Sequence, residues 1–365
     1  MAKTVRKGST ALLVGTRKGA FIFHSGDRKR WSLLGPYFEG VPVYHMALDP
    51  RDGRTVYAAA TSEHWGPSVH RARIGGDFRA GKSAPRFDPS TGLAVTRVWH
   101  VEPGPADEPG TLYAGVEPAA LFRSDDGGDT WRGLDGLNLH PTRKGWQPGN
   151  GGLCLHSVLV DPRDPRHLLA GISAVGVWET RDSGGTWSPQ NEGVRADFLP
   201  DKYPEWGQCV HHLAWDTAGD GGIFQQNHCG SYYRPAGQRR WTEVTKGLPS
   251  GFGFAIAAHP RRKRTAWVVP LEGDFNRVPP NGRLAVWRTT SAGKTWKRTG
   301  AGLPGPHAYM GVLREGLATD RADPVGLYLG TNTGKLYGSR DEGRSWREIA
   351  DDLPPILSVA AGDVR

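Results

Sequence analysis

Short apolar stretches separated by turn residues run along the whole chain. Examples are ALLVG (11–15), TLYAG (111–115), LLAG (168–171) and GVWET (176–180), and turns such as DPRDGRT (49–55) stand between such stretches. Apolar runs bounded by Gly, Pro and Asp are typical of β-strands, and the 3.6-residue period of a helix is missing. The pattern predicts an all-β fold.

A short motif that ends in tryptophan recurs at regular intervals. Its four best copies are SDDGGDTW (124–131), TRDSGGTW (180–187), TTSAGKTW (289–296) and SRDEGRSW (339–346). With three weaker copies, the closing aromatic residues are Trp31, Phe78, Trp131, Trp187, Trp241, Trp296 and Trp346, which stand 47 to 56 residues apart. Four short strands in each interval are the pattern of a propeller blade.

Residues 1–365 are therefore predicted to form a single seven-bladed β-propeller. Each motif is expected on the tight turn before the last strand of its blade, where Gly accepts positive φ, Asp and Ser bond to the backbone, and Trp packs between blades. The first blade lacks a clear strand before ALLVG. We therefore expect the C-terminal stretch ILSVAAGDVR (356–365) to close the ring there.

Composition and charge narrow the range of partners. The chain has 46 basic and 37 acidic residues, and apart from RRKR (261–264) the basic residues are spread widely, so no nucleic-acid partner is expected. Neither a membrane-spanning run nor a secretory leader is recognisable, which predicts no membrane partner and a cytoplasmic location. Cys154, Cys209 and Cys229 are an odd number and are expected to be thiols outside any disulfide.

Histidines on the innermost strands are the first candidates for chemistry. When the repeats are aligned on the turn after the inner strand, His100, His156 and His211 take one position in three consecutive blades, and Tyr44 and Glu315 take it in two others. Such residues converge on the channel mouth of a propeller, so we predict a divalent ion (Zn, Mn or Fe). Its predicted ligands are His100, His156, His211, His228 and Glu315.

The same histidines could instead form a structural hydrogen-bond network. Cys154 and Cys209 lie two residues before two of them and could be further ligands or small buried residues. His45 and His212 are one residue out of register, which a β-bulge would correct.

Carboxylates on loops at the same face are the second group of candidates. Glu117, Glu272, Asp274 and Glu205 are predicted catalytic residues, because glycoside hydrolysis needs one carboxylic acid and one carboxylate. Glu117 is the most unusual, since it replaces a small or apolar residue in a tight connection.

Aromatic and amide side chains accompany these carboxylates, several of them on two long loops (137–155 and 193–209) that are predicted to cover the mouth. They suit a polyhydroxylated small molecule or an oligosaccharide, although the tryptophans could equally cap the blade interface. The predicted substrate-binding residues are Arg17, Tyr44, His64, Trp146, Gln147, Asn150, Tyr203, Trp206, Asn227 and Arg277.

The tryptophan-ending motif resembles the Asp-box (BNR) repeat superfamily, and the resemblance covers essentially the whole chain. That superfamily includes sialidases, xyloglucan-active glycoside hydrolases, sortilin-type receptors and photosystem assembly propellers. The overall likeness is to bacterial BNR-repeat proteins labelled sialidase or glycosyl hydrolase. A true sialidase has Phe/Tyr-Arg-Ile-Pro in its first blade, whereas this chain has LLVGTRKGAFIF (12–23), so sialidase activity is not expected.

Three functions remain open, and the sequence favours an enzyme. The first is a glycosyl hydrolase-like propeller that acts on a carbohydrate or a related polar small molecule at the channel mouth, with or without a histidine-bound ion. The second is a metal-dependent lyase, hydrolase or oxygenase built on the histidines. The third is a non-catalytic propeller that binds a protein or a sugar.

Overall fold

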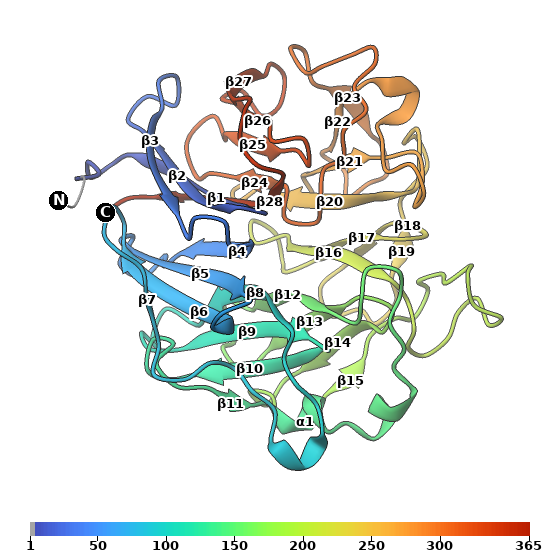
Figure 1. The fold of residues 1–365 in the computed structure, drawn as a ribbon. Coiled ribbons are helices and arrows are strands. Elements are labelled where there is room, and N and C mark those ends of the chain that lie inside the picture. The colour runs from blue at the N-terminus through green and yellow to red at the C-terminus, as the bar shows by residue number, and fades with distance from the viewer. Residues whose placement is uncertain (1–3) are drawn as a thin grey trace. The chain divides into compact units, whose positions relative to one another are not determined.

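The computed structural model describes residues 4–365, and within them the chain forms seven antiparallel sheets of four strands. The predicted seven-bladed β-propeller is confirmed (Figure 1). The sheets are, in strand order, β28-β1-β2-β3, β4-β5-β6-β7, β11-β10-β9-β8, β12-β13-β14-β15, β16-β17-β18-β19, β20-β21-β22-β23 and β24-β25-β26-β27.

Apart from the largely exposed last strand of each sheet, the strands coincide with the short apolar runs. Those of the first four sheets are β1 (Thr10–Thr16), β2 (Gly19–Ser25), β3 (Ser32–Tyr37), β4 (Val43–Leu48), β5 (Thr55–Ser62), β6 (Gly66–Arg73), β7 (Arg79–Ala80), β8 (Arg97–Pro103), β9 (Leu112–Glu117), β10 (Ala120–Ser124), β11 (Arg132–Gly133), β12 (Leu155–Val160), β13 (Leu168–Ile172), β14 (Gly176–Thr180) and β15 (Ser188–Pro189).

The remaining strands are β16 (Val210–Trp215), β17 (Ile223–Asn227), β18 (Gly230–Arg234), β19 (Thr242–Glu243), β20 (Gly253–Ala258), β21 (Ala266–Pro270), β22 (Val286–Thr289), β23 (Lys297–Thr299), β24 (Leu317–Thr319), β25 (Leu327–Gly330), β26 (Leu336–Ser339), β27 (Arg347–Ala350) and β28 (Ile356–Asp363). Helical turns are short: α1 (Asp135–Asn138) and the 3-10 turns η1 (Pro89–Thr91), η2 (Pro141–Gly145) and η3 (Pro280–Gly282). In the part of the chain that the structure describes, no helix has the length and apolar character needed to cross a membrane.

The chain divides into two compact units. Unit 1 comprises the residues up to Ser173 together with 178–188 and 357–365, and unit 2 comprises 174–177 and 189–356. Each unit is described by itself below.

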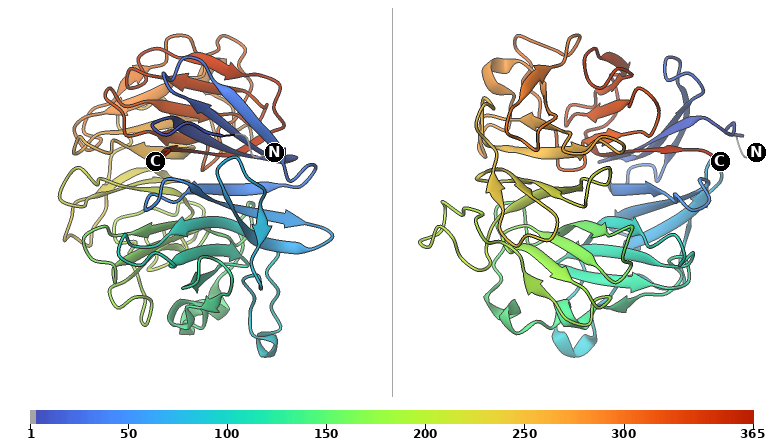
Figure 2. Two further views of the ribbon diagram at one scale, coloured as in Figure 1. Left: turned by 90° about the vertical axis from the view of Figure 1, so that its left-hand side faces the viewer. Right: turned by 180° about the vertical axis from the view of Figure 1, so that it is seen from behind.

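The C-terminal strand completes the first sheet. β28 lies beside β1, and Figures 1 and 2 show the red strand next to the blue one. Backbone hydrogen bonds from Gly8 N to Val364 O (2.8 Å) and from Val364 N to Ser9 O (2.9 Å) continue the pairing. The predicted closure is confirmed, and it leaves β1 without an open edge.

The repeated motifs form the turns before the last strand of each sheet, as predicted. All seven closing aromatic residues stand immediately before the last strand of a sheet, which begins at Ser32, Arg79, Arg132, Ser188, Thr242, Lys297 or Arg347. In the turn at 124–131, the Asp126 carboxylate accepts the Ser124 hydroxyl (2.8 Å) and the Thr130 amide (2.9 Å). The Gly128 amide donates to the Ser124 hydroxyl (2.9 Å), so side chains hold the turn.

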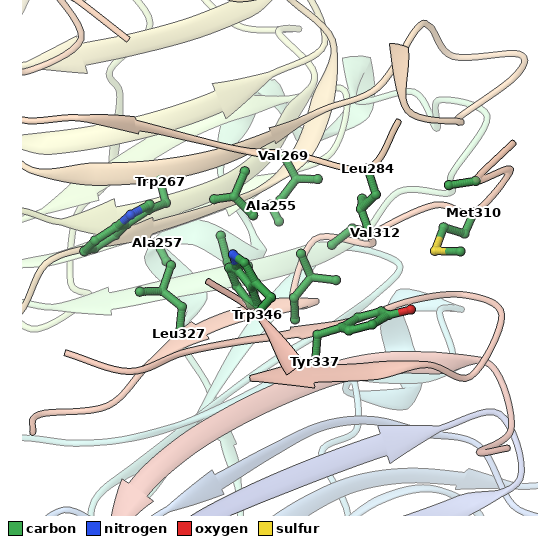
Figure 3. Packing of buried hydrophobic residues seen from close by; sticks show 14 of the residues in the cluster. Ala255, Ala257, Trp267, Val269, Leu284, Met310, Val312, Leu327, Tyr337 and Trp346 are labelled. Atoms are coloured by element: carbon green, nitrogen blue, oxygen red, sulfur yellow. The ribbon is translucent and has the colours of Figure 1, made fainter. Parts of the chain in front are cut away.

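The apolar core lies between neighbouring sheets. In unit 2, Trp267 and Val269 from β21 pack with Leu327, Tyr337 and Trp346 from the next sheet (Figure 3). The Trp346 indole also donates to the Gly343 carbonyl (3.0 Å), which ties the tryptophan back to its turn. Truncating a tryptophan buried in this way costs about 3–5 kcal/mol of stability, so these residues are structural.

Candidate functional site

The first strands of five sheets, β4, β8, β12, β16 and β20, carry a one-residue register shift at corresponding places. In β8, Val98 is opposite Val116 and His100 is opposite Gly115, which leaves Trp99 as the extra residue. The extra residues of β4, β12 and β16 are Tyr44, His156 and His211. A bulge redirects side chains at the end of a strand, which is where functional residues are often found.

The bulges correct the sequence alignment of the histidines. The sequence alignment places Pro105 opposite Asp161 and Asp216, and therefore His100, five residues earlier, opposite His156 and His211. In the structure, the amide that closes the turn is that of Gly104, which bonds to Thr111 O. The corresponding amides of the other sheets belong to Asp49, Asp161, Asp216, His259 and Asp320. This turn is one residue longer than the others, so the prediction of three histidines at one strand position is wrong.

The corrected alignment groups the histidines differently. His156 and His211 are the extra residues of adjacent sheets, and His45, His100 and His212 each follow the extra residue of their own strand.

The bulge brings three side chains of a sheet together, and we call these positions the bulge slot. The first position is the extra residue of the bulge. The second position is on the same strand, two residues earlier. The third position is on the second strand of the sheet, opposite the second position. The slot is Arg97, Trp99 and Glu117 in the third sheet, Cys154, His156 and Ser173 in the fourth, and Cys209, His211 and His228 in the fifth.

The Glu117 slot, in unit 1, is built around a carboxylate. Arg97 Nη1 lies 2.8 Å from Glu117 Oε2, and the Trp99 indole N–H donates to the same oxygen at 2.8 Å. The Tyr44 ring packs on the Trp99 ring with centroids 4.9 Å apart, and both rings are partly exposed. The ion pair and the indole donor hold the carboxylate in place, and the Glu117 side chain keeps 17% of its surface exposed.

The loop at 137–155 closes over this carboxylate. A Cβ atom added at Gly152 would lie 2.5 Å from Glu117 Oε1, and the φ of Gly152 is +89°. Only glycine fits there without displacing the carboxylate. Part of the predicted covering loop therefore does lie against Glu117.

Two buried histidines stand beside this slot. The rings of His45 and His100 are stacked with centroids 4.1 Å apart, and His100 Nε2 lies 3.4 Å from Glu102 Oε2. His156, which was predicted to share an ion with His100, is buried with its Nδ1 atom 3.0 Å from the Ser157 hydroxyl. Among the described residues, no group of three potential metal ligands within 4.8 Å of one another includes His156.

The Cys209 slot, in unit 2, contains three potential metal ligands. One ligand atom from each of Cys209, His211 and His228 lies within 4.8 Å of the other two. The His228 amide donates to the Cys209 carbonyl (3.0 Å), so the backbone fixes this pair. His211 Nδ1 lies 2.5 Å from the Gly253 carbonyl. A carbonyl can only accept, so Nδ1 carries the proton, which leaves Nε2 as the nitrogen with a lone pair for a metal.

Aromatic rings enclose His211. The Phe254 ring stacks on the imidazole with centroids 4.5 Å apart, and the Phe252 ring meets it edge-on at 5.2 Å. Burial, followed by the positive charge of Arg314, lowers the pKa of His211 well below its ordinary value. Burial also lowers the pKa of His228, against the effect of the Asp274 carboxylate. Both imidazoles are therefore neutral near pH 7.

Two cations complete the surroundings of the Cys209 slot. The guanidinium groups of Arg277 and Arg314 lie 5.4 and 5.2 Å from the centroid of the Phe254 ring. Of the predicted site residues, the structure thus brings His211, His228, Asp274 and Arg277 into one neighbourhood of unit 2. Glu315 is paired with His212 at 3.6 Å.

Two predicted substrate-binding residues are buried by structural contacts. Trp146 is 5% exposed, packs on Trp178 with centroids 5.3 Å apart, and donates to the Thr142 hydroxyl (3.1 Å). It therefore caps apolar packing, which was the alternative interpretation. Asn227 is fully buried and shapes the β17–β18 turn, because its side chain accepts the Cys229 amide (3.1 Å).

Most of the other predicted residues lie on exposed loops. Glu272 accepts hydrogen bonds from the Asn276 side chain (3.1 Å) and the Asn281 amide (3.3 Å), so it braces its own loop. Asp274 and Trp206 are partly exposed. The exposed members are Arg17, His64, Gln147, Asn150, Tyr203, Glu205, Glu272 and Arg277.

The sequence reasoning missed four residues that shape the two slots. They are Arg97, Trp99, Gly152 and Phe254. The only available signal was the alternation of polar and aromatic residues in RVWHVE (97–102), which resembles an ordinary strand.

Curated relatives of known activity cover part of the chain. No protein-family model matches it. A xyloglucanase from a Paenibacillus species is 28% identical over 263 residues, which are 63% of this chain and 23% of that protein. An oligoxyloglucan-reducing end-specific xyloglucanase from Emericella nidulans is 27% identical over 202 residues, which are 51% and 22% of the two chains. The chain thus spans about a quarter of the length of these relatives.

Solved structures share the fold at low sequence identity. The GH74 xyloglucanase of Xanthomonas campestris superposes with a TM-score of 0.65 at 18% identity, over 98% of this chain and 52% of that one. The GH74 enzyme of Niastella koreensis gives 0.61 at 15% identity, over 94% and 52%. YCF48 bound to D1 peptide gives 0.52 at 14% identity, over 85% and 82%. This chain therefore shares its propeller architecture with these GH74 enzymes, and the likeness concerns the fold alone.

Proposed function

We propose that this protein is a glycosyl hydrolase-like propeller that acts on a carbohydrate, and that the Glu117 slot binds the sugar. The observation that carries the proposal is the ion-paired carboxylate beside two partly exposed aromatic rings. Sugar C–H faces stack on rings such as those of Tyr44 and Trp99, while carboxylate and guanidinium groups bond hydroxyls. The curated xyloglucanases support the same class of ligand.

The contacts of Glu117 define its role. Because Arg97 and Trp99 both donate to Oε2 and so orient the carboxylate, Glu117 suits a base, a nucleophile or an acceptor for sugar hydroxyls. Hydrolysis requires a second carboxyl group that delivers a proton to the leaving oxygen. The residues that the sequence offers for that role, Glu205, Glu272 and Asp274, all belong to unit 2, and their role stays a prediction.

We also propose that the chain belongs to the Asp-box repeat superfamily. The hydrogen bonds that hold the turn at 124–131 recur in two further copies. In the copy at 289–296, Ser291 replaces the aspartate and its hydroxyl accepts the Thr295 amide (3.1 Å).

A non-catalytic propeller that binds a protein is the second candidate. This chain covers 82% of the YCF48 chain that was solved with a peptide, against 52% of each of the two GH74 enzymes. Unit 2 also exposes large aromatic side chains, Phe275 at 93% and Tyr309 at 67%.

Titration with xyloglucan oligosaccharides tests the proposal. We expect saturable binding by calorimetry and release of reducing ends, and Glu117→Gln should lower turnover on the order of 100-fold by removing a charge from the reacting centre. Glu39→Gln, at an exposed glutamate of the same unit, is the matched control. Equal activity of Glu117→Gln and the unaltered protein would refute the assignment of Glu117. Failure of any oligosaccharide to bind would favour the protein-binding alternative.

A further inference from the structure

The Cys209 slot carries a feature that the proposed carbohydrate site does not use. We propose that Cys209, His211 and His228 bind one ion of the zinc class, with water in a fourth position. The slot belongs to unit 2 and the Glu117 slot belongs to unit 1, so each proposal can fail without the other.

The spacing of the three ligand atoms is close to the spacing found around a bound zinc ion. Zinc bonds of about 2.0–2.3 Å place tetrahedral ligand atoms about 3.5 Å apart, and the three atoms here already lie within 4.8 Å of one another. Small side-chain movements suffice to complete the site. One thiolate and two imidazoles are the donors that zinc prefers, and three protein ligands with one open position are a common catalytic arrangement.

The contacts around the Cys209 slot hold its three side chains in position to bind a metal. Metal-bound histidines usually donate their second ring nitrogen to a carbonyl or a carboxylate, and His211 donates Nδ1 to the Gly253 carbonyl at 2.5 Å. The Phe252 and Phe254 rings pack against the imidazole and hold it in place. The backbone bond between His228 and Cys209 keeps the other two ligands together.

The fourth sheet provides an internal comparison. Its slot has a cysteine and a histidine at the same two positions, Cys154 and His156, but Ser173 replaces the second histidine. Among the described residues, this slot is not part of any group of three potential ligands. The second histidine therefore distinguishes the metal-binding slot.

The charged groups near the Cys209 slot affect how tightly it is expected to bind zinc. Arg277 and Arg314 repel a cation, whereas the thiolate and the Asp274 carboxylate attract it. We expect one equivalent of zinc with a dissociation constant of about 1 µM or lower, which corresponds to about 8 kcal/mol.

The test uses the full chain, stripped of metal and titrated with Zn²⁺ and separately with Co²⁺. Elemental analysis after dialysis should find one equivalent of zinc, and bound Co²⁺ should show a sulfur-to-cobalt charge-transfer band. Because His211 is buried, the decisive variants are at the partly exposed Cys209 and His228. Cys209→Ser should abolish the band, and Cys209→Ser and His228→Gln should each weaken zinc binding on the order of 100-fold.

Cys154→Ser and His156→Ala are the matched controls, since they alter the same positions of the fourth sheet. Both should keep one equivalent of zinc. The proposal is overturned if the stripped protein takes up no stoichiometric metal, or if folded Cys209→Ser and His228→Gln both keep wild-type affinity. Loss of zinc in His156→Ala with an unchanged melting temperature would also overturn it, in favour of the histidine ring predicted from sequence.

Discussion

The Glu117 slot and the Cys209 slot occupy the same backbone positions in two sheets, but their side chains suit different ligands. In the first, a carboxylate accepts hydrogen bonds from Arg97 and Trp99 and faces partly exposed rings. In the second, a thiol and two neutral imidazoles lie against buried phenylalanines. The bulge makes the three side chains converge, and the residue types decide what they bind.

The two slots also differ in how they are supported. Gly152, from a loop outside the sheet, covers the Glu117 carboxylate. The Cys209 slot is held by the backbone bond between His228 and Cys209 and by the bond from the His211 side chain to the Gly253 carbonyl in strand β20 of the next sheet. A polar ligand needs a site that can admit it, whereas an ion needs ligands that are already in place.

His228→Ser should have the largest effect, because it gives the Cys209 slot the same residue types as the fourth sheet. We expect zinc affinity to fall on the order of 100-fold or more, since one of three ligands is lost. Calorimetric titration of the metal-free protein measures this loss. Retention of tight binding would show that the slot does not act as a three-ligand site. Carbohydrate binding in the same variant should be unchanged.

Gly152→Ala should impair the Glu117 slot, with a loss of oligosaccharide affinity of about 30-fold. The new Cβ would stand 2.5 Å from Glu117 Oε1, and alanine is strained at a φ of +89°. Gly66→Ala is the control, because Gly66 has a similar φ of +78° with open space around its Cβ position. If both variants lose affinity equally, backbone strain and not contact with Glu117 is responsible.

Trp99→Phe should have a smaller effect on the same slot. The ring that stacks on Tyr44 stays, and the hydrogen bond from the indole to Glu117 is lost, so we expect a five- to tenfold loss of affinity, or about 1 kcal/mol. Calorimetry with the same oligosaccharide measures it. An unchanged affinity would mean that Arg97 alone orients the carboxylate.

Asp126→Asn should have the smallest effect. Although burial opposes it, hydrogen bonds from Thr130 and Ser124 lower the pKa of Asp126 to about 2 from an ordinary 3.8. A lowered pKa stabilises the folded state above about pH 4, and the stabilisation is lost as the pH falls toward 2. Since the group is exposed, we expect only about 1 kcal/mol.

Thermal melting between pH 2 and pH 6 measures the effect of Asp126→Asn. The variant should melt lower at pH 6 and like the unaltered protein at pH 2. Ser291→Ala, in the copy of the turn that lacks the aspartate, should show no such pH dependence. This result would show that the sheets differ in how their turns are stabilised. The turn before Trp241, in the sheet that holds the Cys209 slot, has no aspartate.

The seven-bladed fold could be predicted because its signals are local. Each closing aromatic residue from Trp31 to Trp346 stands immediately before the last strand of a sheet, since the turn motif satisfies its own hydrogen bonds within a few residues. The unusual position of Glu117 was also visible, because a carboxylate in a tight apolar connection has few structural roles.

The residues that meet in each slot could not be predicted, because their meeting depends on the register in which neighbouring strands pair. One additional residue in the turn between Gly104 and Thr111 displaced His100 by one position in the alignment, and a one-residue shift moves a side chain to the other face of a strand. The partnership of Cys209 with His228 depends on pairing between β16 and β17, and the burial of Trp146 depends on packing against Trp178.

By itself the sequence determined the architecture, the number of repeats and the residue types available for chemistry, since short-range periodicity and turn chemistry are written into neighbouring residues. Only the tertiary structure decided which of those residues meet. A β-bulge inserts a residue without any distinctive composition. The contacts of the two slots join residues about twenty or more positions apart, such as Arg97 with Glu117 and His211 with Gly253, which no local pattern links.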